Sequence, residues 1–342
     1  MIISDFRSDT VTRPTQEMYE AIQKAPLGDD VLGDDHTVIE LEKLSAEITG
    51  FDAALFVPSG TMGNAIAVRV WTRDGSEVIL EEMAHIYTSE VGHIAYISRA
   101  IPRPLRSDRG VINPDDLRKA IRKEDLQRSA TSLVCLENTH NYWGGKALRP
   151  DYVAEIKNIC TENNLPLHMD GARIFNACIF LKVDVKEFTK NLDSLMFCLS
   201  KGLSAPVGSM LCGSKAFIEQ ARRIRKLLGG GMRQAGILAA CGIVSIKKMV
   251  ERLEDDHKNA KKLAEGLSQL PFIRINPDDV ETNIVIVETT ENPQEILNFL
   301  ASNGILALQF GPGRIRFVTH KDVDETDVDR ALEVLKKFKH FN

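Results

Sequence analysis

The sequence predicts an α/β protein: a large domain with a mostly parallel sheet between helices, and a smaller C-terminal α+β domain. Two observations lead to this class. Short, nearly continuous apolar runs such as LPLHMD (165–170) and SLMFCLS (194–200) are typical of strands covered on both faces. These runs alternate with helical patterns, which favours a parallel sheet. An N-terminal arm and the large domain are expected over 1–250, and a linker helix and the small domain over 251–342.

In the first third of the chain, spacing predicts a helix, a strand and a second helix. Apolar residues recur every three or four positions from Val38 to Ile48, so a helix is expected there, ended by Gly50. The apolar run AALFV at 53–57 predicts a buried strand. A Pro-Ser-Gly turn separates it from a helical run over 61–71.

The rest of the large domain continues this alternation. Asn113 and Pro114 are typical of a helix start, with asparagine as the cap and proline at the first helical position. The other predicted strands are EVILEE at 77–82, SLVCLEN at 132–138, LPLHMD at 165–170, SLMFCLS at 194–200 and VGSMLCG at 207–213.

The C-terminal part begins with a long helical stretch. Residues 214–270 have an almost entirely helical pattern, interrupted only by three glycines at 229–231. After Pro271 the pattern alternates again, which predicts a separate small domain. Its predicted elements are a strand at 282–289, a helix at 293–302, a strand at 314–320 and a helix at 324–338.

Composition narrows the function classes. The chain has 342 residues, 43% hydrophobic and 27% charged, with a net charge of -5, which predicts neither a nucleic-acid partner nor a membrane partner. The start MIISDFRSDT lacks the features of a signal peptide. Six cysteines without a CxxC pair favour reduced core thiols over disulfides or zinc, so we expect a cytoplasmic protein and no metal site.

The most informative residue is Lys201, which directly follows a predicted strand. Lysine is rarely buried without a reason, and an amine in such a place becomes a nucleophile. Ligands of α/β sheets bind at strand ends. An isolated Ser-Lys-Gly is weak evidence for a ligand site, because most lysines are solvated surface groups. Support for such a site becomes stronger because other polar residues also lie at predicted strand ends.

Asp170 closes a further predicted strand, and His85 follows another, EVILEE. A carboxylate at a strand end can pair with a protonated pyridine nitrogen and make the pyridoxal phosphate ring an electron sink. The simpler alternative is that Asp170 caps the next helix. His85 could stack on an aromatic cofactor, although a lone histidine is more often structural.

The segment PSGTMGN (58–64) predicts a phosphate cradle. A strand, a glycine-containing turn and a helix start leave free backbone N–H groups at the positive end of the helix dipole. Ser59, Gly60 and Thr61 are the candidate ligands, and the segment matches neither the P-loop nor the dinucleotide fingerprint. One cofactor, pyridoxal phosphate, would explain the cradle, the aspartate, the histidine and the lysine together.

With these residues in view, the sequence resembles the low-specificity L-threonine aldolases, pyridoxal-phosphate enzymes of fold type I. The likeness runs essentially end to end. The segments that carry it are RSDTVTRPT, GDDVLGDD, ALFVPSGTMGN, LENTHN, HMDGARIFNA, MFCLSKGLSAPVGSML, LGGGMRQAG and IRFVTHKDV.

The resemblance implies a retro-aldol cleavage of L-threonine or L-allo-threonine to glycine and acetaldehyde. It assigns Lys201 to the cofactor aldehyde, Asp170 to the pyridine nitrogen and His85 to the ring face. It further implies a homotetramer, built as a dimer of dimers with active sites at a subunit interface. The remaining residues it implies are Ser59, Gly60, Thr61 and a neighbouring subunit's Arg233 for the phosphate, Ser8, Arg173 and Arg316 for the substrate carboxylate, and Arg173 near the cofactor's phenolic oxygen.

One position departs from the family pattern. Many relatives have a histidine before LENTHN that is thought to contact the substrate hydroxyl, and this chain has Gln127 there. Glutamine cannot act as a base at neutral pH. The expected base is therefore His85 or an ordered water, with His140 as a further candidate.

Other functions remain open at this point. The same scaffold supports β-elimination, racemisation or transamination of a small amino acid. A catalytically silent pyridoxal-phosphate-binding regulator is a second alternative, and a helical interaction protein built around 214–270 is a third.

Overall fold

A computed structural model describes residues 3–338 and shows a large sheet of seven strands. The strand order is β2-β10-β9-β8-β7-β3-β4, and only β10 is antiparallel to its neighbours. The predicted mostly parallel sheet is thus confirmed. The strands are β2 (Ala53–Val57), β3 (Glu77–Glu81), β4 (Ile101–Leu105), β7 (Thr131–Glu137), β8 (Leu167–Asp170), β9 (Ser194–Cys198) and β10 (Ser209–Gly213).

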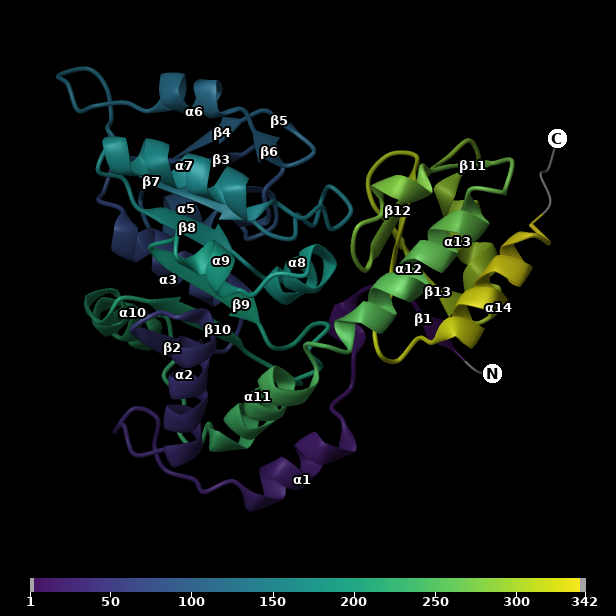
Figure 1. The fold of residues 1–342 in the computed structure, drawn as a ribbon, viewed down its shortest axis with the longest axis horizontal. Coiled ribbons are helices and arrows are strands. Elements are labelled where there is room, and N and C mark those ends of the chain that lie inside the picture. The colour runs from purple at the N-terminus through teal and green to yellow at the C-terminus, as the bar shows by residue number, and fades with distance from the viewer. Residues whose placement is uncertain (1–2, 339–342) are drawn as a thin grey trace.

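Helices cover both faces of this sheet (Figure 1). Side chains alternate along β9: Leu195 and Phe197 pack on one face, while Met196 and Cys198 pack on the other. This explains why the strand sequences are apolar throughout. The first face is covered by α2 (His36–Thr49), α6 (Pro114–Ala120), α7 (Pro150–Glu162), α8 (Ile174–Leu181), α9 (Lys186–Thr189) and α11 (Gly236–Lys248), and the second by α3 (Gly60–Trp71), α4 (His85–Thr88), α5 (His93–Tyr96) and α10 (Lys215–Leu227).

The helix boundaries follow the local signals in the sequence. Asp35 caps α2 by accepting a hydrogen bond from the Val38 N–H. Gly50 ends α2 in the left-handed conformation, at φ 73°, as the sequence predicted. Asn113 likewise caps α6, with Pro114 at its first position. The six cysteines are free and buried, in agreement with the predicted core thiols.

The second, smaller sheet is antiparallel and has the order β11-β12-β15-β14. The strands are β11 (Ile273–Arg274), β12 (Ile284–Thr289), β14 (Leu308–Gln309) and β15 (Arg314–Val318), and the associated helices are α12 (Leu253–Leu267), α13 (Pro293–Ser302) and α14 (Glu325–Leu335). The final helix is three residues shorter than predicted at its C-terminal end. Both ends of the described part of the chain lie at this domain (Figure 1).

The N-terminal arm connects the two domains. Strand β1 (Ser4–Asp5) pairs in parallel with β13 (Ile305–Leu306), and Phe6 is buried in the small domain's core. The chain then runs through a 3-10 helix (Asp9–Val11) to α1 (Gln16–Lys24), which packs on α11. The boundary at 250/251 stays a prediction, and residues 1–2 and 339–342 lie outside the described part.

The sequence did not predict edge strand β4. It contains Pro102 and Pro104, and proline is tolerated only where a strand has an unpaired edge. The remaining short elements are β5 (Ser107–Asp108), β6 (Val111–Ile112) and a 3-10 helix (Pro277–Asp279). Among residues 3–338, no helix has the length and apolar character that crossing a membrane requires.

Candidate active site

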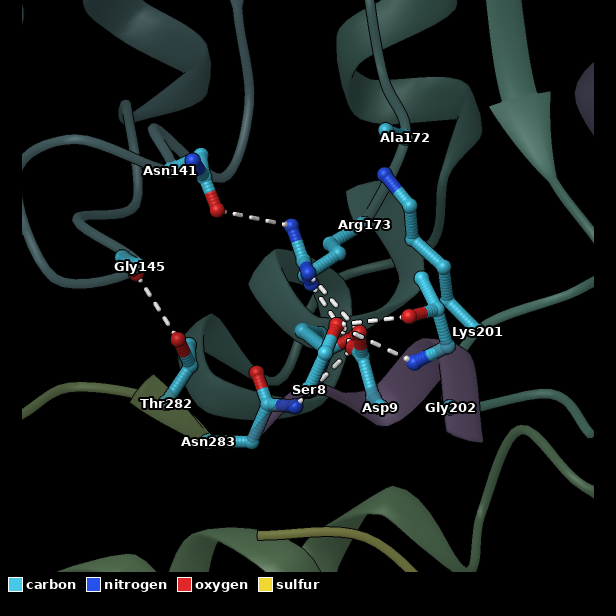
Figure 2. A network of polar contacts seen from close by, with 12 residues as sticks. Ser8, Asp9, Asn141, Gly145, Ala172, Arg173, Lys201, Gly202, Thr282 and Asn283 are labelled. Carbon is cyan, nitrogen blue, oxygen red and sulfur yellow. Dashed lines mark hydrogen bonds and ion pairs between the residues drawn. The ribbon is translucent and has the colours of Figure 1, made fainter. Parts of the chain in front are cut away.

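Lys201 and Asp170 lie at the carboxyl ends of adjacent strands. Asp170 is the last residue of β8 and is level with Met196 of β9, and Lys201 is three residues beyond the end of β9. Figure 2 shows the Lys201 side chain extending from this loop toward Ala172. The Lys201 carbonyl lies 2.9 Å from the Thr12 hydroxyl, so the N-terminal arm holds the lysine loop.

Asp170 is a buried carboxylate held by neutral donors. Its oxygens accept hydrogen bonds from Asn64 Nδ2 at 2.9 Å and the Ala172 N–H at 3.0 Å. Burial and the nearby charges of Glu137 and Glu90 raise the pKa of Asp170 to about 6. A cation placed beside this carboxylate would therefore be strongly favoured.

The predicted phosphate cradle forms the start of α3. Ser59 caps the helix by accepting a hydrogen bond from the Met62 N–H at 3.2 Å, and Gly60 and Thr61 begin its first turn. Gly60 is required because a Cβ there would lie 2.9 Å from Cys198 Sγ. The first N–H groups of a helix have no partner within it, so they can bind an anion.

His85 begins α4, and its backbone N–H donates to Glu137 Oε2 at 2.6 Å. Its ring Nδ1 lies 2.8 Å from Glu90 Oε1, which leaves Nε2 as the nitrogen free to meet a ligand. Burial lowers the pKa of His85, but the hydrogen bond to Glu90 and the charges of Asp170, Glu90 and Glu137 outweigh it and raise the pKa.

Glu90 is fully buried and connects the histidine to the aspartate. It contacts His93 Nε2 at 2.8 Å and accepts from Asn64 Nδ2 at 2.9 Å, the same amide group that reaches Asp170. Donor atoms of His85, Glu90 and Asp170 lie within 4.8 Å of one another. Such a cluster could hold a metal, so the expected absence of one stays a prediction.

Arg173 is held by Asp9 from the N-terminal arm (Figure 2). Arg173 Nε and Nη2 donate to the two Asp9 oxygens at 2.7 and 2.8 Å. Its Nη1 donates to Asn141 Oδ1 at 3.4 Å. Ser8, next to Asp9, caps the 3-10 helix. Arg173, which was predicted to bind the substrate carboxylate, is therefore already paired with the Asp9 carboxylate.

Arg316 lies on β15 of the small domain, and its guanidinium contacts the same asparagine, Asn141, as Arg173 does. Its Nη1 donates to the same Asn141 oxygen at 3.2 Å, its Nη2 donates to the Arg7 carbonyl at 3.2 Å, and the guanidinium lies over the Phe310 ring. The contacts described for Arg316 include no carboxylate, and its Nε is buried without a hydrogen-bond partner. Burial and the charge of Arg173 lower its pKa to about 10.

A cavity of about 230 Å³ opens between the domains at this point. It is lined by Met83, His85, Thr88, Ser89, Asn141, Tyr142, Phe310 and Gly311. The volume suits a small substrate.

Two predicted residues lie elsewhere in this chain. Gln127 is exposed in the loop before β7, at the amino end of the strand, opposite the edge that carries Asp170. That loop is tied to the start of β3, because Arg122 pairs with Glu77. The structure therefore does not bring Gln127 into this chain's own site. Arg233 is 61% exposed and pairs with Asp29.

His140 does not reach the cavity, since it is fully buried between Glu81, 3.1 Å away, and Glu137, 3.8 Å away. The sequence reasoning missed Asp9, Glu90, Glu137 and Asn141. Glu137 could have been found, because it ends a predicted strand as Asp170 does. Glu90 and Asn141 lie in loops or turns, and Asp9 begins a three-residue 3-10 helix; in such short or irregular segments, spacing gives no signal of burial.

These residues fit pyridoxal phosphate. Asp170 is a buried carboxylate without a cationic hydrogen-bond partner among the contacts described. The protonated pyridine nitrogen of the cofactor would be a suitable cation to pair with it. The start of α3 offers amides for the phosphate, and Lys201 offers an amine for the aldehyde. Asp170 and Lys201 lie at the carboxyl ends of adjacent strands, and the roles of all four features toward the cofactor stay predictions.

The fold and the cleft together define a pyridoxal-phosphate enzyme of fold type I. The model of the β-eliminating lyase family ("Beta-eliminating lyase") matches residues 5–290, so this chain belongs to that family. Membership, together with PLP-bound proteins of the same fold, indicates a pyridoxal phosphate cofactor.

Individual relatives are similar over almost the whole chain. Low-specificity L-threonine aldolase 1 of Arabidopsis thaliana is 44% identical over 97% of this chain and 95% of its own length. The low specificity L-threonine aldolase of Escherichia coli K12 is 42% identical over 98% of each chain. The solved threonine aldolase of Leishmania major has a TM-score of 0.83 at 20% identity, covering 97% of this chain and 98% of that one.

Proposed function

We propose that this protein is a carbon–carbon lyase that cleaves L-threonine, L-allo-threonine and related β-hydroxy-α-amino acids to glycine and an aldehyde, acetaldehyde in the case of threonine. The relatives named above carry this activity in their names. The observation that carries the proposal is that Lys201 and Asp170 lie at the carboxyl ends of adjacent strands, while Arg173 of the large domain and Arg316 of the small domain both donate to Asn141.

Each of these residues has a defined task. The Lys201 amine would hold the cofactor through its aldehyde, and the Asp170 carboxylate would keep the pyridine nitrogen protonated. When bound, pyridoxal phosphate supplies an electron sink for the bond that breaks. Ser59, Gly60 and Thr61 hold the phosphate at the start of α3.

Arg316 orients the substrate. A guanidinium binds a carboxylate through two parallel hydrogen bonds, and its buried Nε has an unused donor for one of them. Fixing the carboxylate would fix rotation about the substrate's N–Cα bond and so select Cα–Cβ as the bond that the cofactor weakens. Ser8 is close enough to Asp9 and Arg173 to assist (Figure 2).

The β-hydroxyl must lose its proton as Cα–Cβ breaks. His85 is the proposed base, with an ordered water as the alternative, because His85 lines the cavity and its Nε2 is free. Gln127 is exposed at the opposite edge of the sheet, and glutamine is not a base at neutral pH, so we assign it no part in this task.

A spectrum and a threonine assay test the function. Purified protein is expected to show a visible absorption band, and borohydride should remove this band and leave a label on Lys201. Incubation with L-threonine should give glycine and acetaldehyde in equal amounts. Protein with the band but without turnover would indicate a silent cofactor-binding protein instead.

β-Elimination is the second candidate, because the matching family model is named for it. That reaction would convert L-threonine to 2-oxobutanoate and ammonia rather than to glycine. Product analysis of the same incubation therefore distinguishes the two reactions. Racemisation or transamination would leave the carbon skeleton of threonine whole.

The proposed assembly is a homotetramer, a dimer of dimers in the cytoplasm. Apolar side chains lie exposed around the loop of Arg233: Leu32 is 76% exposed and Leu227 is 82% exposed. A second copy would bury such side chains and could bring Arg233 to its neighbour's phosphate. Six buried, unpaired cysteines are compatible with a reducing compartment.

A further inference from the structure

His168 is a buried histidine that the proposed chemistry does not use. It lies on β8 two residues before Asp170, so both side chains point to the same face of the sheet, and it is fully buried there against α3. Burial lowers the pKa of His168 to about 3, so its ring is neutral at pH 7. A neutral imidazole has one nitrogen that donates and one that accepts, and a buried ring needs a partner for each.

Both ring nitrogens of His168 have a partner, and these partners belong to a longer chain of hydrogen bonds. Nε2 lies 3.1 Å from Asn64 Oδ1, and Nδ1 lies 2.9 Å from Ser194 Oγ. Ser194 also accepts a hydrogen bond from Trp71 Nε1 at 2.8 Å. Asn64 and Trp71 are both on α3, two turns apart, and therefore lie on the same side of that helix. The chain of hydrogen bonds thus connects α3 to strands β8 and β9.

Two carboxylates at one end determine the direction of these hydrogen bonds. Asn64 Nδ2 donates to Glu90 Oε1 and to Asp170 Oδ2, both at 2.9 Å. Burial raises the pKa of Glu90, but hydrogen bonds from two histidines outweigh burial and hold it well below its usual range, so Glu90 is ionised. Turning the amide over would place its oxygen against this carboxylate, whose oxygens can only accept. Asn64 Oδ1 therefore faces His168, and Nε2 must carry the hydrogen.

The other end of the chain of hydrogen bonds agrees with this direction. Because the neutral His168 ring has its hydrogen on Nε2, Nδ1 is an acceptor and the Ser194 hydroxyl can donate to it. The Trp71 indole can only donate, so the hydroxyl accepts one hydrogen and donates its own to the ring. Among the contacts of residues 3–338, the Ser194 hydroxyl has no other acceptor. Each donor in this series thus has an acceptor.

We propose that His168 is a positioning residue that acts through Asn64 and holds the Asp170 carboxylate in place as the partner of the cofactor's pyridine nitrogen. With the Nε2 hydrogen on Asn64 Oδ1, both amide hydrogens are directed at carboxylates. Without that hydrogen the amide can turn over, and Asp170 and Glu90 then lose the donor that they share. The inference rests on the proposed role of Asp170 toward the cofactor and not on threonine as the substrate.

The test uses two forms of the cofactor. Pyridoxal phosphate has the ring nitrogen, whereas 1-deazapyridoxal phosphate has a C–H group in its place and offers Asp170 nothing to pair with. Fluorescence titration of the cofactor-free protein gives a Kd for each, and the ratio of the two reports the pairing with Asp170, because the other contacts of the cofactor are shared. His168→Leu should lower the preference for pyridoxal phosphate about tenfold, the effect expected when a hydrogen bond to a charged group is lost.

His168→Gln is the matched variant, because a glutamine amide can still donate a hydrogen to Asn64 Oδ1, and it should keep most of the preference. Thr189→Val controls for the loss of a buried hydrogen bond elsewhere. The Thr189 hydroxyl donates to the Thr49 carbonyl at 2.6 Å where α9 packs on α2, so this variant should keep the wild-type preference.

A double-mutant cycle tests whether His168 acts through Asn64. Asn64→Leu should lower the preference for pyridoxal phosphate as His168→Leu does, and the double variant should lower it no further. Independent, additive losses in the two single variants would overturn the inference, because His168 would then act by another route.

An unchanged preference in folded His168→Leu would also overturn the inference, and so would an equal loss of affinity for both forms, which indicates a structural role alone. If His168→Leu does not fold, Ser194→Ala replaces it. Without the Ser194 hydroxyl, the ring hydrogen is no longer held on Nε2, so the preference should fall in the same direction; no change overturns the inference. Protein that shows all these ratios but makes no glycine from threonine would refute the proposed function and leave this inference standing.

Discussion

At the scale of single residues, the charge and orientation of the side chains in the cleft depend on which buried groups contact one another. Glu90 is the residue that joins His85 to the Asp170 environment, through Asn64. Glu90 Oε1 accepts a hydrogen bond from His85 Nδ1, which fixes the ring of His85 and leaves Nε2 free. Catalytic properties of His85 therefore depend on a residue that does not itself line the cavity.

His85→Asn tests the proposed base. If His85 removes the hydroxyl proton, kcat should fall about 100-fold or more, the usual contribution of a positioned base. The visible absorbance measures how much cofactor is bound, and a stopped acetaldehyde assay measures turnover. Full turnover in a variant that retains the visible band would exclude His85 as the base and leave an ordered water as the candidate.

The pH profile gives a second test, with Glu90→Gln as the variant. A base must be unprotonated, so kcat/KM should rise with pH through the raised pKa of His85. Asp170 and Glu137 also face His85, but Glu90 makes the direct contact. Removing its charge lowers the pKa of His85, so the rising limb should move to lower pH. A limb that stays in place would favour water as the base.

At the scale of elements, the start of α3 combines a structural and a chemical task. The Ser59 side chain caps the helix, while the first backbone N–H groups have no partner within the helix and are proposed to bind the phosphate. The sheet determines where this helix begins, because Gly60 and Gly63 pack directly against Met196 of β9. A larger residue at either position would push the anion site away from the lysine.

A comparison of Ser59→Ala with Ser214→Ala distinguishes the capping of α3 from the proposed binding of the cofactor phosphate. Ser214 caps α10 with the same geometry, accepting from the Phe217 N–H at 3.3 Å, but at the opposite edge of the sheet. Both variants should lower the free energy of unfolding of the cofactor-free protein by about 1 kcal/mol. Only Ser59→Ala should weaken pyridoxal phosphate binding, measured by fluorescence titration. Equal cofactor affinity in the two variants would argue against the cradle.

At the scale of the whole molecule, the cleft exists because two domains and the N-terminal arm meet. Arg316 comes from the small sheet, Asp170 and Lys201 from the large one, and Asp9 from the arm between β1 and α1. Strand β1 pairs with β13, so the arm is anchored in the small domain before it crosses the cleft. Changes in the arm should therefore alter substrate binding more than the stability of either core.

Leu32→Lys tests the proposed assembly, with Ile101→Lys as control. Both side chains are exposed, so neither change should destabilise the isolated chain by more than about 0.5 kcal/mol. Leu32 lies on the apolar surface near Arg233, whereas Ile101 lies on edge strand β4. Sedimentation velocity should show a smaller species, with weaker cofactor binding, only for Leu32→Lys. An unchanged assembly would place the interface elsewhere.

Sequence reasoning alone determined the α/β class, most strand positions and the four groups that suit pyridoxal phosphate. It could do so because these features are local: buried strands are continuously apolar, helix caps lie within four residues, and the carboxyl ends of parallel strands meet at one edge. Lys201 and Asp170 were found because each follows such a strand.

The tertiary structure alone decided the state of each charge. Asp9 and Arg173 are 164 residues apart in sequence, and nothing local indicates that they pair. Likewise, only the structure placed Gln127 at the edge of the sheet opposite Asp170, and only the structure showed that Arg316 lacks the carboxylate partner that Arg173 has. The physical reason is that the energy of a buried charge depends on its neighbours in space, and long-range packing chooses those neighbours.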